Sequence, residues 1–64
     1  MLKVIEVLAE SDKSWEDAAA NAVRIASKTV RNIRSINVKN LQATVMDGKL
    51  TAYRINAKIA FTLD

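Results

Sequence analysis

Apolar and polar positions follow different patterns along the chain and predict a strand, a helix and two further strands. Residues 2–9 are apolar on both faces of a strand except at Lys3 and Glu6, and such a strand is usually covered on both sides. Residues 15–33 repeat apolar side chains every three or four positions, which is typical of an amphipathic helix. Its apolar stripe consists of Trp15, Ala18, Ala19, Ala22, Val23, Ala26, Val30 and Ile33.

The predicted helix has clear signals at both ends. Residues 10–14 are polar and read as a loop, and Ser14 is followed three positions later by Asp17, the spacing of a capping box. The Ser14 hydroxyl can accept a hydrogen bond from the Asp17 N–H, which a helix start otherwise leaves unpaired. Acidic residues stand in the first turn and basic residues near the end, an order that suits the helix dipole.

The remaining sequence predicts a long hairpin. In the strand over 35–46 the apolar parity switches near Lys39 and Asn40, which predicts a β-bulge there. Asp47-Gly48 is a turn signal. A strict two-residue loop would put Gln42 opposite Tyr53, so we expect an odd-length loop with Gly48 at positive φ. The strand over 50–63 then alternates cleanly, with one apolar face made of Tyr53, Ile55, Ala57, Ile59, Phe61 and Leu63.

These elements predict an α+β fold of order β-α-β-β, in which a three-stranded antiparallel sheet wraps around one long helix. The other face of the sheet is polar: Ser35, Asn37, Gln42, Arg54, Asn56 and Lys58. One helix cannot cover both faces of the sheet. We therefore expect the second face to meet another subunit.

Chain length strengthens the expectation of an assembly. The chain has 64 residues and a mass of 7.1 kDa, enough for one domain spanning 1–64. A chain of this size buries only about 60% of its unfolded surface and usually needs an additional source of stability, such as a disulfide, a bound metal or oligomerisation. Cysteine and histidine are absent, so disulfides and thiolate or imidazole metal sites are excluded. Oligomerisation is then the remaining way to stabilise so small a domain.

The charge and hydropathy of the chain argue against nucleic-acid and membrane partners. The net charge is +3 and no run of basic residues exceeds two, so solvated helix-end charges explain the basic residues better than a nucleic-acid surface does. No apolar stretch approaches the roughly 20 residues of a membrane span. The first residues include Lys3 and Glu6 and do not resemble a signal peptide. We expect a cytoplasmic protein with no membrane partner.

Candidate chemistry is sparse. The serines have no histidine to activate them, and Glu16 and Asp17 are explained by capping, so we expect no enzyme. Glu10, Asp12 and Asp47 could join a hard-cation site if symmetry brings copies together. Trp15 could stack on a planar ligand, but it also begins the apolar stripe, and we favour the structural role.

The sequence resembles the dodecins over essentially its whole length. The resemblance is carried by KVIEV at 3–7, SWEDA at 14–18, Asn21-Ala22, ASKTVRNIR at 26–34, DGK at 47–49 and the strand from Tyr53 to Leu63. It implies a β-α-β-β subunit of a hollow homododecamer. It also implies a non-catalytic binding or storage role, because characterised dodecins bind flavins in pairs between subunits.

The chain departs from the family at the flavin pocket. Ser35 stands where these proteins have a stacking tryptophan, and Arg54 stands where they have a glutamine that hydrogen-bonds the flavin ring. Serine offers no stacking face, and arginine only donates hydrogen bonds, so we expect FMN and riboflavin binding to be weakened. Ser35, Arg54 and Asn37 are the candidate ligand-binding residues.

The same departures suggest other ligands. The sequence is similar to a dodecin branch that lacks this residue pair and has been linked to calcium, so a cation is one candidate ligand, with no metal-binding residue assigned. An anion drawn by Arg54 and Lys58 is another. Flavin or coenzyme sequestration through a rearranged pocket is the alternative function.

Overall fold

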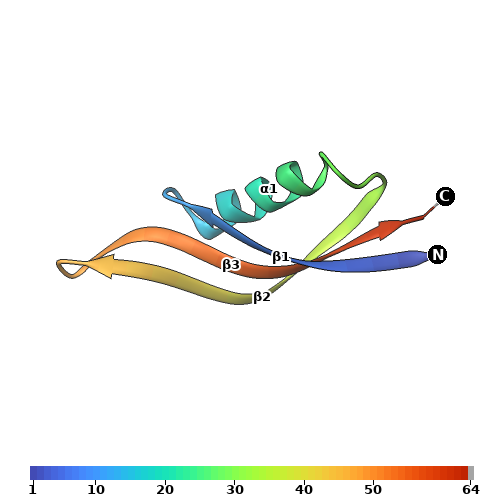
Figure 1. The fold of residues 1–64 in the computed structure, drawn as a ribbon. Coiled ribbons are helices and arrows are strands. Elements are labelled where there is room, and N and C mark those ends of the chain that lie inside the picture. The colour runs from blue at the N-terminus through green and yellow to red at the C-terminus, as the bar shows by residue number, and fades with distance from the viewer. Residues whose placement is uncertain (64) are drawn as a thin grey trace.

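The computed structural model describes residues 1–63 and consists of one helix on a three-stranded antiparallel sheet (Figure 1). The strands are β1 (Leu2–Ser11), β2 (Ile33–Met46) and β3 (Lys49–Thr62), and the helix is α1 (Trp15–Ala26). The sheet order is β1-β3-β2, with both pairings antiparallel. The predicted β-α-β-β order and antiparallel sheet are confirmed.

The helix is shorter than the predicted 15–33 and ends at Ala26. Ser27 and Thr29 bind the helix end through their hydroxyls, which donate to the Val23 and Ala26 carbonyls. Residues 27–30 continue as an irregular turn with three- and four-residue hydrogen bonds. Asn32 then takes a left-handed φ of 60°, a conformation that asparagine tolerates and that cannot continue a helix. Val30 and Ile33 still pack against the core, which explains why the apolar stripe ran past the helix.

The three strands match the predicted ranges to within two residues. The expected bulge is present, because the pairing of β2 with β3 shifts between Val38 and Asn40. A second shift lies between Ile33 and Ser35 and was not predicted. At the other end, β1 extends to Ser11, which pairs with Tyr53.

The expectation of an odd-length hairpin loop is wrong, although Gly48 does have a positive φ. Met46 pairs with Lys49, which leaves a two-residue loop with Asp47 at φ 53° and Gly48 at φ 76°, as a type I′ turn requires. The odd residue is taken up inside β3, where the register shifts between Thr44 and Val45 and leaves Thr51 as the extra residue. The hydroxyls of Thr44 and Thr51 lie 2.6 Å apart across this bulge.

The core is thin and built largely from alanine. The buried apolar residues are Ala9, Ala18, Ala22, Ala26, Ile55, Ala57, Ile59 and Phe61. The alanine stripe of α1 lets the helix approach the apolar face of β3 closely. Trp15, Val7 and Ile5 pack around this cluster.

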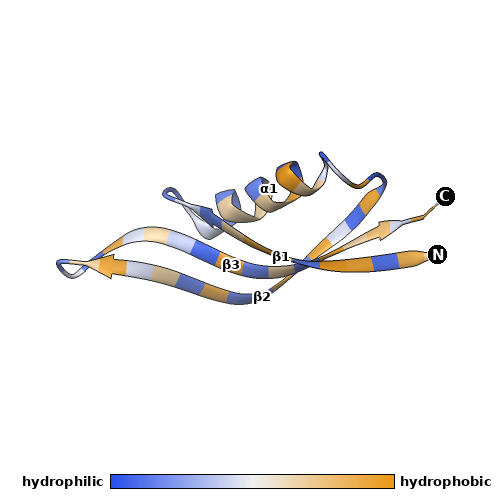
Figure 2. Cartoon of the chain, viewed as in Figure 1, coloured by the Kyte–Doolittle hydropathy of each residue, from blue (hydrophilic) through white to orange (hydrophobic). Residues whose placement is uncertain are grey.

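The subunit is elongated, and much of its apolar surface is uncovered. Its extents are 48 × 19 × 13 Å and its radius of gyration is 12.9 Å, against about 11 Å for a compact chain of this length. The β2–β3 hairpin projects beyond α1 (Figure 1), and Figure 2 shows apolar stretches on both this hairpin and the N-terminal strand. The exposed large apolar residues of the hairpin strands are Val38, Leu41, Val45, Met46 and Leu50.

Candidate ligand-binding site

The sheet face that points away from α1, which we call the open face, carries polar residues in cross-strand rows. Because Ile55, Ala57 and Ile59 face the helix, the alternating residues Arg54, Asn56 and Lys58 face the other way. The register places Glu10 and Gln42 on either side of Arg54. The next row is Leu8, Asn56 and Asn40, and the row after it is Glu6, Lys58 and Asn37.

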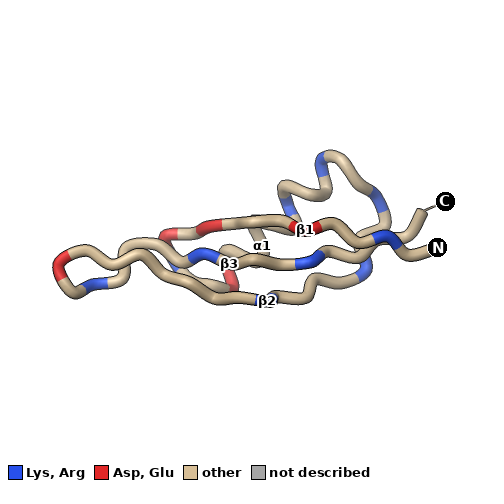
Figure 3. The backbone as a smooth tube through the Cα atoms, turned by 60° about the horizontal axis from the view of Figure 1, so that its bottom comes forward, with Lys and Arg blue, Asp and Glu red and all other residues tan. Residues whose placement is uncertain are grey.

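Opposite charges face each other along this surface. Acidic positions of β1 lie beside basic positions of β3 (Figure 3). Glu10 is opposite Arg54, and Glu6 is opposite Lys58. The Arg54 Nε donates to Glu10 Oε1 at 2.6 Å, and the two side chains are 53% and 54% exposed. Such cross-strand pairs fix the register modestly, and here the Glu10 carboxylate also neutralises the Arg54 guanidinium.

A cavity of about 400 Å³ lies over the first two rows. It is lined by Leu8, Ala9, Glu10, Asn40, Gln42, Arg54, Ile55 and Asn56. Within the described chain, Asn56 Oδ1 is buried and has no hydrogen-bond partner. A buried acceptor without a partner is costly, so this atom is where a ligand or neighbouring subunit would gain a hydrogen bond.

The structure separates the three predicted site residues within one chain. Arg54 lines the cavity, but Ser35 and Asn37 do not. Ser35 pairs with Ala60, six residues from Arg54 along β3, which is about 20 Å at roughly 3.3 Å per residue. Their joint role stays a prediction that requires a second subunit. Gln42, Asn40 and Asn56 line the cavity instead, and the polar alternation of the open face already pointed to Gln42 and Asn56.

The predicted cation ligands are also dispersed. Glu10 is paired with Arg54, Asp47 lies in the hairpin turn, and Asp12 lies in the loop before α1. Within residues 1–63, no three acidic side chains gather in a way that could hold a metal ion. A cation site made of three carboxylates would therefore need more than one copy of the chain.

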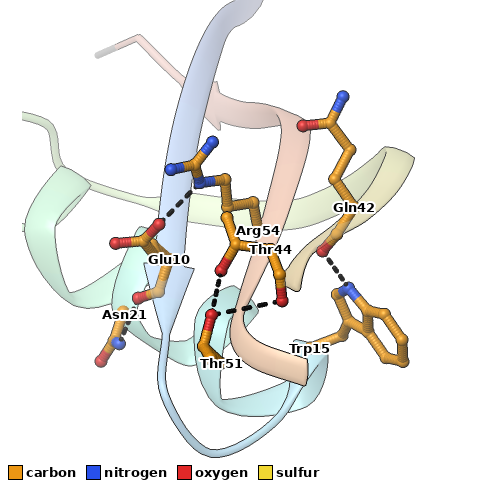
Figure 4. Close-up of polar contacts among 7 residues, drawn as sticks. All are labelled: Glu10, Trp15, Asn21, Gln42, Thr44, Thr51 and Arg54. Carbon is orange, nitrogen blue, oxygen red and sulfur yellow. Dashed lines mark hydrogen bonds and ion pairs between the residues drawn. The ribbon is translucent and has the colours of Figure 1, made fainter. Parts of the chain in front are cut away.

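Trp15 has the structural role that the sequence favoured. Its indole Nε1 donates to the Gln42 carbonyl at 2.8 Å (Figure 4), and its ring meets the Tyr53 ring edge-on at 4.9 Å between centroids. The helix start is thereby tied to both strands of the hairpin. Since the indole binds the backbone of Gln42, it also holds this part of the cavity wall in place.

Two polar contacts around the loop after β1 escaped the sequence analysis. The buried Ser11 donates through its hydroxyl to Asp17 Oδ2 at 2.6 Å. The Asn21 side-chain amide donates to the Glu10 carbonyl at 3.1 Å (Figure 4). Both contacts join β1 to α1 and fix the position of Glu10.

No helix in the described part of the chain has the length and apolar content needed to cross a membrane.

Comparison with known proteins places this geometry in a family. The family model described as Dodecin matches residues 1–64. The calcium dodecin of Mycobacterium tuberculosis is 36% identical over 61 residues, covering 95% of this chain and 86% of that protein. The crystal structure of that protein, described as having a novel calcium-binding site, covers 100% of this chain and 91% of its own, with 37% identity and a TM-score of 0.83.

A dodecin from Streptomyces coelicolor matches with 28% identity and a TM-score of 0.93, covering 100% of this chain and 91% of its own. Fold and sequence therefore agree over the full length of the chain, and the chain belongs to the dodecin family.

Proposed function

We propose that the chain is the subunit of a cytoplasmic, non-catalytic homododecamer that binds or stores a small ligand on the open faces of its sheets. The observation that carries the proposal is the open face, where Arg54, Gln42 and Asn56 line a cavity. The subunit that bears this cavity is elongated and not compact. The ligand is not a tightly held flavin, and a cation such as calcium is one candidate.

The exposed surface supports the assembly. The isolated chain exposes 4751 Å², against about 4,100 Å² expected for a compact protein of this mass. Leu8 is 80% and Leu2 is 63% exposed on β1, and contiguous apolar surface of this kind usually marks a subunit interface. Contacts between copies would cover these residues and would also bring Ser35 of one subunit towards Arg54 of another.

The residue types argue against tight flavin binding. Ser35 cannot stack on a planar ring. Arg54 can only donate hydrogen bonds, and it is already paired with Glu10. The unpaired Asn56 Oδ1 is the one observation that favours the alternative of a rearranged flavin pocket, since it could accept from a ring N–H.

Titration with FMN and riboflavin separates the two functions. The proposal predicts that the purified assembly is colourless and that flavin fluorescence is not quenched at sub-micromolar protein concentration. Mass spectrometry of the small molecules and metals released from the native assembly then identifies what is bound. Sub-micromolar quenching, or flavin among the released molecules, would establish the alternative function instead.

A further inference from the structure

We propose that Glu10 sets the ligand class of the open-face cavity: by holding Arg54, it keeps oxyanions such as phosphates and carboxylates out. The inference rests on the proposed function only in treating this cavity as the ligand site. It goes further because it names the residue that decides which ligands are rejected.

The geometry makes Glu10 the direct competitor of an incoming anion. Glu10 and Arg54 stand in the same cross-strand row and both line the cavity. The Arg54 side chain reaches towards β1 and meets the carboxylate at 2.6 Å (Figure 4). The Asn21 contact to the Glu10 carbonyl holds this end of β1 against α1, so the backbone of Glu10 stays level with Arg54.

Charge balance within the cavity also opposes an incoming oxyanion. An oxyanion at Arg54 would have to displace Glu10 or lie within a few ångströms of its negative charge. The other cation of the face, Lys58, lies opposite Glu6 in the register. In these two rows, each cation therefore has a carboxylate opposite it, despite the net charge of +3.

What remains in the cavity suits an uncharged polar ligand. Glu10 engages Arg54 through Nε, which leaves the donors on the two Nη atoms for a ligand. Asn56 Oδ1 offers a buried acceptor, and Leu8 adds apolar lining. A ligand with both a hydrogen-bond donor and an acceptor, and no charge, would satisfy these groups.

The test is titration of the wild-type protein and the Glu10→Gln variant with inorganic pyrophosphate by calorimetry at low ionic strength. Glutamine keeps the size of the side chain and can still accept from Arg54 Nε, so only the charge is lost. We expect the variant to bind pyrophosphate about tenfold more tightly, since the pair is half exposed and partly screened. The gain should shrink as salt is added.

Two further variants make the result specific. Glu6→Gln removes the same charge from the same strand and face but lies outside the cavity, and we expect it to change affinity by no more than about twofold. Adding Arg54→Gln to Glu10→Gln should abolish the gain. No gain in Glu10→Gln, an equal gain in Glu6→Gln, or a gain that survives the loss of Arg54 would each overturn the inference.

Light scattering and thermal melting on the same samples keep this inference separate from the proposed function. A wild-type assembly without a gain in Glu10→Gln would reject the role of Glu10 and leave the assembly intact as a proposal. A single chain that nevertheless gains pyrophosphate affinity would reject the assembly and leave the role of Glu10 standing.

Discussion

The Ser14 side chain accepts a hydrogen bond from the Asp17 N–H at 2.9 Å, with its own backbone extended at φ −168°. Asp17 in turn accepts from the buried Ser11 hydroxyl. Ser14 thus caps the helix, and Asp17, whose N–H donates to Ser14, links the helix back to Ser11 at the end of β1. At the scale of single residues, the start of α1 depends on this short chain of contacts.

Ser14→Ala should therefore lower the free energy of unfolding by about 1 kcal/mol, because a helix-start N–H loses its partner. The measurement is chemical denaturation at one fixed subunit concentration, since dissociation and unfolding are linked. Ser27→Ala is the matched control: its hydroxyl donates to the Val23 carbonyl, which already accepts from the Ser27 N–H. We expect it to change stability by less than about 0.5 kcal/mol, and equal effects would contradict the capping role.

Sequence alone predicted the Ser14 cap but not the Glu10–Arg54 pair. Capping depends on residues three positions apart, and local spacing shows it directly. The ion pair joins residues 44 positions apart, and only the strand register brings them together. That register pairs β1 with β3 over ten residues without a bulge, and the local pattern of either strand does not fix it.

At the scale of elements, the closeness of α1 to the sheet depends on small side chains. Ala18 is 0% and Ala22 is 3% exposed, and Ala57 is fully buried in the same core cluster. A helix with larger residues at these positions would lie further from β3. The distance between helix and sheet is thus set by alanine on both sides of the interface.

Ala22→Leu should accordingly destabilise the fold by about 1–3 kcal/mol through overpacking. Ala20→Leu makes the same change on the exposed side of the same helix and should be nearly neutral. Thermal melting of both variants at equal subunit concentration provides the comparison. Equal losses from the two substitutions would show that helix propensity, and not the helix–sheet distance, governs the result.

At the scale of the whole molecule, a single subunit leaves many large apolar side chains exposed to solvent. The size argument and the two-sided apolar pattern of residues 2–9 predicted this from sequence, and the exposed Leu2, Val4 and Leu8 agree with it. The sequence could not show which residues meet in the assembly. The separation of Ser35 from Arg54 within one chain follows from the hairpin register, which pairs Ser35 with Ala60.

Light scattering should give a mass near 85 kDa, about twelve times the 7.1 kDa of one chain.

Leu41→Asp should lower this mass while leaving the subunit folded, because Leu41 is 59% exposed on the projecting hairpin and a charge there opposes an apolar contact between copies. Ala20→Asp introduces the same charge on the exposed side of α1 and should preserve the mass. A compact, cooperatively melting wild-type monomer would contradict the assembly.

The sheet order has a consequence for how the protein is produced. β3 is central, so β1 and β2 each present one long outer edge whose amide and carbonyl groups could pair with any other extended strand. Chains that have not assembled would therefore be exposed to misdirected pairing along these edges. Refolding yield should pass through an optimum with dilution, since crowded chains aggregate and sparse ones fail to find their neighbours.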